Sequence, residues 1–371
     1  MADFEIGRGR TARQAFSLDD VAIVPSRRTR DVDDVSTAWE IDAFRFEIPM
    51  MAHPSDATMS PAAVIEIGRL GGLGVLNAEG LWTRYADPQP IYDELLGLDD
   101  DAAATRTLQR VYAEPVKPEL ITERIGQIRS AGVTVAVRLS PQHTLTYATT
   151  VLDAGVDLLV IQGTIVSAEH VSTDTEPLNL KTFIADLDVP VIVGGCTNYQ
   201  TALHLMRTGA AGIIIGVGND AMATTGDVLG IQVPMATAIA DAAAARRDYL
   251  DETGGRYVHV IADGYLVDGG LVAKALACGA DAVMLGDALS HGQECPGAGL
   301  WWESVAAHPS LPRGSMGMRT ATPEPLAKIL LGPADRAVGT ENLFGAVRRA
   351  MAKCGYSDVK AFQKVELICH H

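Results

Sequence analysis

Eight short runs of apolar residues recur along the chain, each bounded by Gly, Pro or Asp and most separated by a stretch long enough for a helix. Continuous apolar runs of this kind are typical of parallel strands that are covered on both faces. The runs are 48–54, 71–77, 133–140, 155–163, 189–195, 210–217, 257–264 and 280–287. Eight strand–helix units in one chain predict an α/β fold, a (β/α)8 TIM barrel.

The alternative architecture is a doubly wound open sheet, which normally begins with a G-x-G-x-x-G turn after its first strand. No such turn follows the first run, so residues 1–371 are interpreted as a single barrel domain. The gap between the second and third runs is too long for one connection, and its Pro and Asp clusters predict a short helical insertion at 81–118. Residues before 48 form an N-terminal lead-in, and residues 309–371 form a C-terminal extension.

The chain is acidic, because 30 Lys and Arg against 46 Asp and Glu give a net charge of −16. A surface of that sign repels nucleic acid and anionic lipid. The start has no apolar signal-peptide core, and no apolar run approaches the roughly 18–20 residues of a membrane span. We therefore expect a cytoplasmic protein with neither nucleic acid nor membrane as a partner.

The cysteines predict neither a disulfide framework nor a zinc site. There are five, Cys196, Cys278, Cys295, Cys354 and Cys369, scattered without a C-x-x-C pair. No metal site is inferred from them or from the two terminal histidines.

Ligands of such a barrel bind at the carboxyl ends of the strands, and phosphates favour the loops after the seventh and eighth strands. The seventh run ends in Asp263-Gly264, and the eighth ends in Gly286-Asp287. A glycine lets a phosphate approach the backbone closely, and Asp263 can accept hydrogen bonds from vicinal ribose hydroxyls. Both glycines could instead serve tight turns, and Asp263 could cap one.

Six segments carry a more specific pattern: 18–25 (LDDVAIVP), 233–239, 260–264 (VIADG), 274–286, 294–297 (ECPG) and 345–356. Together they resemble the inosine-5′-monophosphate (IMP) dehydrogenase and GMP reductase family over nearly the whole chain. The resemblance implies an oxidoreductase of purine nucleotide and GMP biosynthesis. It also implies a barrel that binds a purine 5′-monophosphate and NAD(P), usually as a homotetramer. Segment 81–118 replaces the CBS domains that many members carry, as in a short branch of the family.

The resemblance also assigns binding positions. The nucleotide positions are His53, Ser55, Gly216, Gly218, Ala221, Asp263, Gly264, Gly286 and Asp287. The NAD positions are Gln162, Gly163, Gly194 and Gly195, with Gln162 in place of an aspartate.

The family's reaction depends on a cysteine in a loop of the form G-x-G-x-x-S-x-C-T-T, because a thiolate attacks purine C2 and holds the intermediate during hydride transfer. Here the loop runs from Gly216 to Thr225, with Ala223 at the nucleophile position before Thr224 and Thr225. Ala221 and Asp287 replace two serines that contact phosphate, and a carboxylate repels a phosphate dianion. The flap, 311–319, lacks the Arg-Tyr pair that activates water.

Three hypotheses remain open. The first is the family reaction, IMP + NAD⁺ + water to XMP + NADH. The second is a catalytically silent relative that binds nucleotides or has a regulatory or assembly role, alone or with a true IMP dehydrogenase. The third is a barrel enzyme that uses Asp263, Asp287 or His53 on another phosphorylated ligand. The residues favour the second, because the methyl group of Ala223 cannot replace a thiolate.

Overall fold

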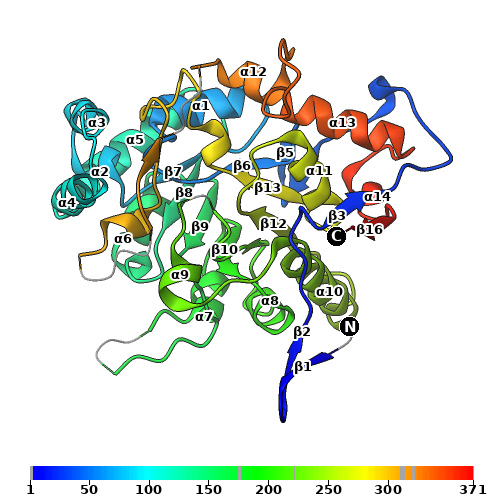
Figure 1. Cartoon of the computed structure of the whole chain (residues 1–371). Coiled ribbons are helices and arrows are strands. Elements are labelled where there is room, and N and C mark those ends of the chain that lie inside the picture. Colours follow the sequence, from blue (N-terminus) through cyan, green and yellow to red (C-terminus); the bar gives the residue numbers. More distant parts are fainter. Residues whose placement is uncertain (1–2, 174–176, 221, 310–313, 319–321, 371) are drawn as a thin grey trace.

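The computed structural model describes residues 3–173, 177–220, 222–309, 314–318 and 322–370. Within these ranges, eight parallel strands form one sheet in the order β6-β13-β12-β11-β10-β9-β8-β7, shown in Figure 1. The strands are β6 (Met50–Ala52), β7 (Val75–Asn77), β8 (Ala136–Leu139), β9 (Leu158–Gln162), β10 (Val191–Cys196), β11 (Gly212–Ile215), β12 (His259–Asp263) and β13 (Ala282–Leu285). A parallel bridge between Met51 and Leu73 closes the sheet. The predicted (β/α)8 barrel is confirmed, and each strand falls on one of the eight predicted runs.

Helices cover the outside of the barrel. They are α1 (Pro61–Arg69), α5 (Pro118–Ser130), α6 (Thr144–Asp153), α7 (Leu180–Ala185), α8 (Tyr199–Met206), α10 (Met235–Thr253), α11 (Gly269–Ala277) and α13 (Leu343–Lys353). Local sequence explains where several begin. Ser60 accepts a hydrogen bond from the amide of Ala63 at the start of α1, and Asn198 and Asp268 cap α8 and α11 in the same way.

An apolar cluster and a short hairpin pack together at the amino ends of the strands. The interior holds a buried apolar cluster that includes Val160, Ile214 and Met284. The hairpin of β4 (Trp39–Ile41) and β5 (Phe44–Phe46) packs against it at the amino ends of the strands, where Trp39 Nε1 donates to His259 Nδ1 at 3.2 Å. Ligands of this fold bind at the opposite end of the barrel, at the carboxyl ends of the strands.

Segment 81–118 contains α2 (Leu81–Arg84), α3 (Gln89–Leu96) and α4 (Asp101–Tyr112), which lie to one side of the barrel in Figure 1. These helices share an apolar cluster with the chain after β13, including Trp301 and Trp302. The segment after β13 contains η2 (Asp287–Leu289), β14 (Leu300–Trp301), η3 (Ser304–Ala307) and β15 (Gly317–Met318). Helices far from β13 in sequence thus support the segment that covers the carboxyl ends of the strands.

The two termini meet on the opposite side. The extension from 309 contains α12 (Leu326–Leu331), α13, α14 (Val359–Phe362) and β16 (Leu367–Cys369), and β16 pairs antiparallel with β3 (Val21–Ile23). Before β3, the hairpin of β1 (Asp3–Gly7) and β2 (Arg10–Arg13) projects from the body in Figure 1. In the described part of the chain, no helix has the length and apolar character needed to cross a bilayer.

Candidate functional site

A cavity of about 560 Å³ lies at the carboxyl ends of the strands. This volume is typical of a site for one small ligand. Several sequence-predicted positions line it: His53, Gln162, Gly163, Gly195, Gly216, Gly218, Ala223, Thr225 and Asp263. They come from five different strand ends, so the barrel brings together residues that are far apart in the sequence.

The other predicted positions lie elsewhere. Among the described residues, Ser55, Gly194, Thr224, Gly264, Gly286 and Asp287 are not part of the cavity lining. Ala221 lies outside the described residues. The Ser55 hydroxyl donates to the carbonyl of Trp302 at 2.6 Å, and a Cβ on Gly194 would lie 2.5 Å from the Cβ of Ile214. These two positions therefore serve packing within the fold.

An indole ring covers Gly286, the glycine at the end of the eighth strand. A Cβ added to Gly286 would lie only 2.2 Å from Cη2 of Trp301. Trp301 is fully buried, donates from Nε1 to Asp220 Oδ1 at 2.6 Å and packs edge-on against His53. Asp287 begins η2 directly after this glycine. The indole thus fills the space next to Gly286 in which the sequence predicted a phosphate.

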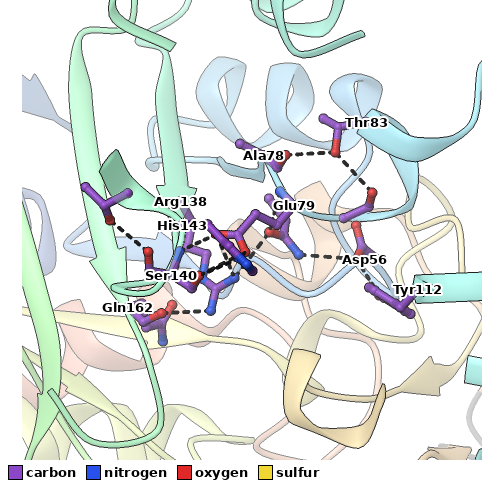
Figure 2. Close-up of polar contacts among 12 residues, drawn as sticks. Asp56, Ala78, Glu79, Thr83, Tyr112, Arg138, Ser140, His143 and Gln162 are labelled. Carbon is purple, nitrogen blue, oxygen red and sulfur yellow. Dashed lines mark hydrogen bonds and ion pairs between the residues drawn. The ribbon is translucent and has the colours of Figure 1, made fainter. Parts of the chain in front are cut away.

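Figure 2 shows a polar network on the other side of the cavity that the sequence analysis did not predict. Glu79 follows β7, and its carboxylate accepts hydrogen bonds from the amide and hydroxyl of Ser140, which follows β8. His143 Nδ1 donates to Glu79 Oε2 at 2.6 Å. Arg138 Nη2 donates to the carbonyl of Gln162 at 2.7 Å, and its Nη1 lies 4.0 Å from Glu79 Oε1. These four side chains line the cavity.

This network favours an ion pair between the Glu79 carboxylate and the His143 imidazolium. Burial opposes ionisation of Glu79, but the hydrogen bond from His143 and the charge of Arg138 outweigh it and lower the pKa of Glu79 to about 2. The same hydrogen bond raises the pKa of His143 above its ordinary value. The His143 ring is half-exposed, so the pair can exchange protons with a ligand or with water.

Three carboxyl groups, those of Asp220, Asp263 and Glu303, line another part of the cavity. Burial, together with the negative charge of Asp220, raises the pKa of Glu303 to about 8. Burial and both neighbouring carboxyls also raise the pKa of Asp263 well above its ordinary value. Glu303 therefore favours its protonated form at neutral pH, and burial shifts the pKa of Asp263 in the same direction.

Two neutral side chains beside these carboxyls have an unsatisfied polar atom. Gln162 Nε2 donates to Asp263 Oδ2 at 3.2 Å, while Gln162 Oε1 has no hydrogen-bond partner among the described residues. His53 Nδ1 also has no partner there, and burial lowers the pKa of His53 to about 3. Buried polar atoms without partners are uncommon and point to a missing ligand or water.

No cysteine of the described chain lines the cavity. Burial raises the pKa of Cys196 and Cys278 to about 12, and that of Cys295 further. Such thiols stay protonated and are poor nucleophiles. Ala223, at the predicted nucleophile position, does line the cavity, and its backbone forms an antiparallel bridge with Gly314.

The predicted flap lies partly outside the described residues, which exclude 311–313 and 319. Its remaining part lies against the loop that carries Ala223, where the amide of Ser315 donates to the carbonyl of Met222 at 3.2 Å. In the described chain, no group of three or more His, Cys, Asp or Glu side chains is arranged to hold a metal ion.

Comparisons with known proteins agree on the family. The model of the "IMP dehydrogenase / GMP reductase domain" matches residues 15–328. An uncharacterized oxidoreductase of Mycolicibacterium smegmatis is 58% identical over 98% of both chains, and one of Mycobacterium leprae is 58% identical over 98% of this chain and 99% of its own.

More distant and structural relatives carry the family name itself. An inosine-5′-monophosphate dehydrogenase of Aquifex aeolicus is 29% identical over 66% of this chain and 46% of its own length. A crystal structure of an IMP dehydrogenase/GMP reductase-like protein from Corynebacterium glutamicum has a TM-score of 0.95 and 56% identity, covering 99% of this chain and 98% of that one.

Proposed function

Since the chain belongs to the IMP dehydrogenase/GMP reductase family, we propose that it is a divergent member that binds one small polar ligand at the barrel mouth without the family's thiolate-dependent oxidation. The observation that carries this proposal is Ala223, which lines the cavity at the nucleophile position while no described cysteine does. Loss of a covalent nucleophile costs on the order of 10⁴–10⁶ in rate, or roughly 5–8 kcal/mol of transition-state stabilisation.

The residues around the cavity do not fit NAD beside a nucleotide. A volume of about 560 Å³ suits one small ligand, whereas hydride transfer needs a nucleotide and a dinucleotide together. The guanidinium groups of Arg84 and Arg138 donate to the backbone carbonyls of Glu79 and Gln162, and four side-chain carboxyl groups line the site. A diphosphate therefore meets few free donors and several acidic groups, and we derive no hydride-transfer step.

This proposal leaves the chain a binding, regulatory or assembly role. We include in this proposal that the chain forms a homotetramer and that it associates with a cysteine-containing IMP dehydrogenase. The family membership and the complete barrel support such roles, because neither depends on the residue at position 223.

A second candidate function is acid–base catalysis on a different phosphorylated ligand. The pairing of His143 with Glu79 favours it, because a half-exposed imidazole oriented by a carboxylate is a common general base. Glu303, protonated at neutral pH, could supply the acid from elsewhere in the same cavity.

A thermal-shift and calorimetric screen with IMP, GMP, XMP, NAD⁺ and NADP⁺ tests the main proposal. A ligand at 100 times its Kd stabilises the native state by about 2.7 kcal/mol even if no reaction follows. We expect that NAD⁺ does not stabilise this protein, either alone or together with IMP. A cysteine-containing IMP dehydrogenase in the same assay should be stabilised under both conditions. Joint saturable binding of IMP and NAD⁺ would contradict the proposal.

A further inference from the structure

One wall of the cavity consists of carboxyl groups. Asp220 follows β11, Asp263 ends β12 and Glu303 follows β14, and all three line the cavity. The charges of Asp220 and Glu303 act on Asp263, so the three groups lie within electrostatic range of one another. We call Asp220, Asp263 and Glu303 the carboxyl wall.

The acceptor character continues beside the carboxyl wall. Gln162 is more than nine-tenths buried, and because its Nε2 donates to Asp263, its unpartnered Oε1 is left as an acceptor. His53 is equally buried and has one ring nitrogen without a partner. Gln162 Oε1 calls for a ligand with a hydrogen-bond donor, because a buried acceptor without a donor costs free energy.

The donor side chains of the cavity form a second group. Arg138, Ser140 and His143 cluster around Glu79, as Figure 2 shows. Gln162 connects the two groups, because its side-chain amide donates to Asp263 and its backbone carbonyl accepts from Arg138. A phosphate would be repelled by ionised carboxyl groups of this wall, whereas a cationic nitrogen would favour their ionised form and gain charge-assisted hydrogen bonds.

We propose that the carboxyl wall binds the cationic nitrogen group of an organic ligand, such as an amidinium, guanidinium or ammonium group. The proposal rests on the function proposed above, because it names the ligand class of the same cavity. The bound nitrogen group replaces the protons of Asp263 and Glu303 and donates to Gln162 Oε1.

Binding should therefore release protons, and affinity should rise with pH. The titratable or charged groups that line the cavity with Glu303 are Asp220, Asp263, His53, Glu79, Arg84, Tyr112, Arg138, His143 and His308. His53 is neutral above about pH 3, and the arginines keep their charge throughout. His143 loses its positive charge as pH rises, and this also increases the affinity for a cation. The contribution of Glu303 therefore has to be isolated by substitution.

Benzamidine and benzamide provide a matched pair of probes, because they have similar shapes and only benzamidine is charged. Calorimetry on the full chain should show benzamidine binding at least about tenfold tighter than benzamide at pH 8.5. The preference should shrink at least about tenfold at pH 6, because Glu303 is then protonated. Titrations in buffers of different ionisation enthalpy should show proton release for benzamidine alone.

Substitutions locate the effect. Glu303→Gln should weaken the binding of benzamidine at least about tenfold at pH 8.5 and leave the affinity for benzamide unchanged. Glu119→Gln, on the exposed first turn of α5, is the matched control and should change neither. If Glu303→Gln fails to fold, Asp263→Asn takes its place.

Equal affinity for the two probes, or no saturable binding of benzamidine, would overturn the inference. A benzamidine preference that survives both Glu303→Gln and Asp263→Asn would also overturn it, because the cation would then bind elsewhere. These outcomes leave the proposed function intact, which fails only if IMP and NAD⁺ bind together or are turned over.

Discussion

At the scale of single residues, the contact between Glu79 and His143 has the most direct measurable consequence. The hydrogen bond from His143 to Glu79 raises the pKa of the imidazole. We predict that Glu79→Gln lowers the pKa of His143 towards its ordinary value, because the amide cannot stabilise the imidazolium by charge.

An NMR pH titration of the His143 ring checks this prediction. The ring of exposed His170 serves as the internal reference and should keep its titration midpoint in both proteins. An unchanged His143 midpoint in Glu79→Gln would mean that the pair is not formed in solution.

The sequence identified only part of the site, for a reason visible at individual residues. His53, Gln162 and Asp263 were predicted from strand ends and from the resemblance, and they meet in one cavity. Glu79 and Ser140 also follow strands directly, so the same strand-end rule could have found them. The position of Trp301 over Gly286 depends on the path of a segment far along the chain, and no local pattern encodes it.

At the scale of elements, helix α4 links segment 81–118 to the cavity. Tyr112 ends α4, lines the cavity and donates to Asp56 Oδ2 at 2.5 Å. Asp100 is the N-cap of this helix, and its carboxylate accepts hydrogen bonds from the amides of Ala102 and Ala103. We predict that Asp100→Ala destabilises the protein by about 1 kcal/mol, a typical value for loss of an N-cap.

Urea unfolding measures this loss, with Asp99→Ala as the control. Asp99 is exposed and lies one residue before the cap, so its removal takes away the same charge without the cap contact. Equal stability of the two variants would show that charge, and not capping, determines the effect.

The elements themselves were more predictable than the site. The eight apolar runs fix the strands because a strand covered on both faces must be apolar throughout. The plug made by β4 and β5 was not predicted, because it depends on Trp39 meeting His259, more than two hundred residues later. Segment 81–118 contains three helices, but its packing against Trp301 and Trp302 is a tertiary contact that composition does not reveal.

At the scale of the whole molecule, the buried carboxyls predict an unusual dependence of stability on pH. The pKa of Glu303 is raised from 4.5 to about 8, so the native state holds a proton that the unfolded state releases above about pH 4.5. Stability should therefore fall as pH rises from 5 to 8. Asp56, with a pKa raised to about 6, and Asp263 act in the same direction.

Glu79 has the opposite effect on stability, because its pKa is lowered to about 2 in the native state. The stability that it contributes is lost only as pH falls below about 4.5. Glu303→Gln should flatten the fall between pH 5 and 8 by an amount on the order of 2–5 kcal/mol. Denaturant unfolding at several pH values measures it. A variant as pH-dependent as the wild type would show that Glu303 is solvated in the native protein.

The central claim is that the chain keeps the family's barrel and has lost its oxidation chemistry. The most direct test is NADH formation from IMP and NAD⁺, followed by absorbance, with purified protein free of host dehydrogenase. We predict a rate below roughly one ten-thousandth of that of a cysteine-containing homologue. Ala223→Cys should remain inactive in the same assay, because Trp301 covers Gly286 and the carboxyl wall is unchanged. Steady turnover at about 1 s⁻¹ or faster by the wild-type protein would contradict the account.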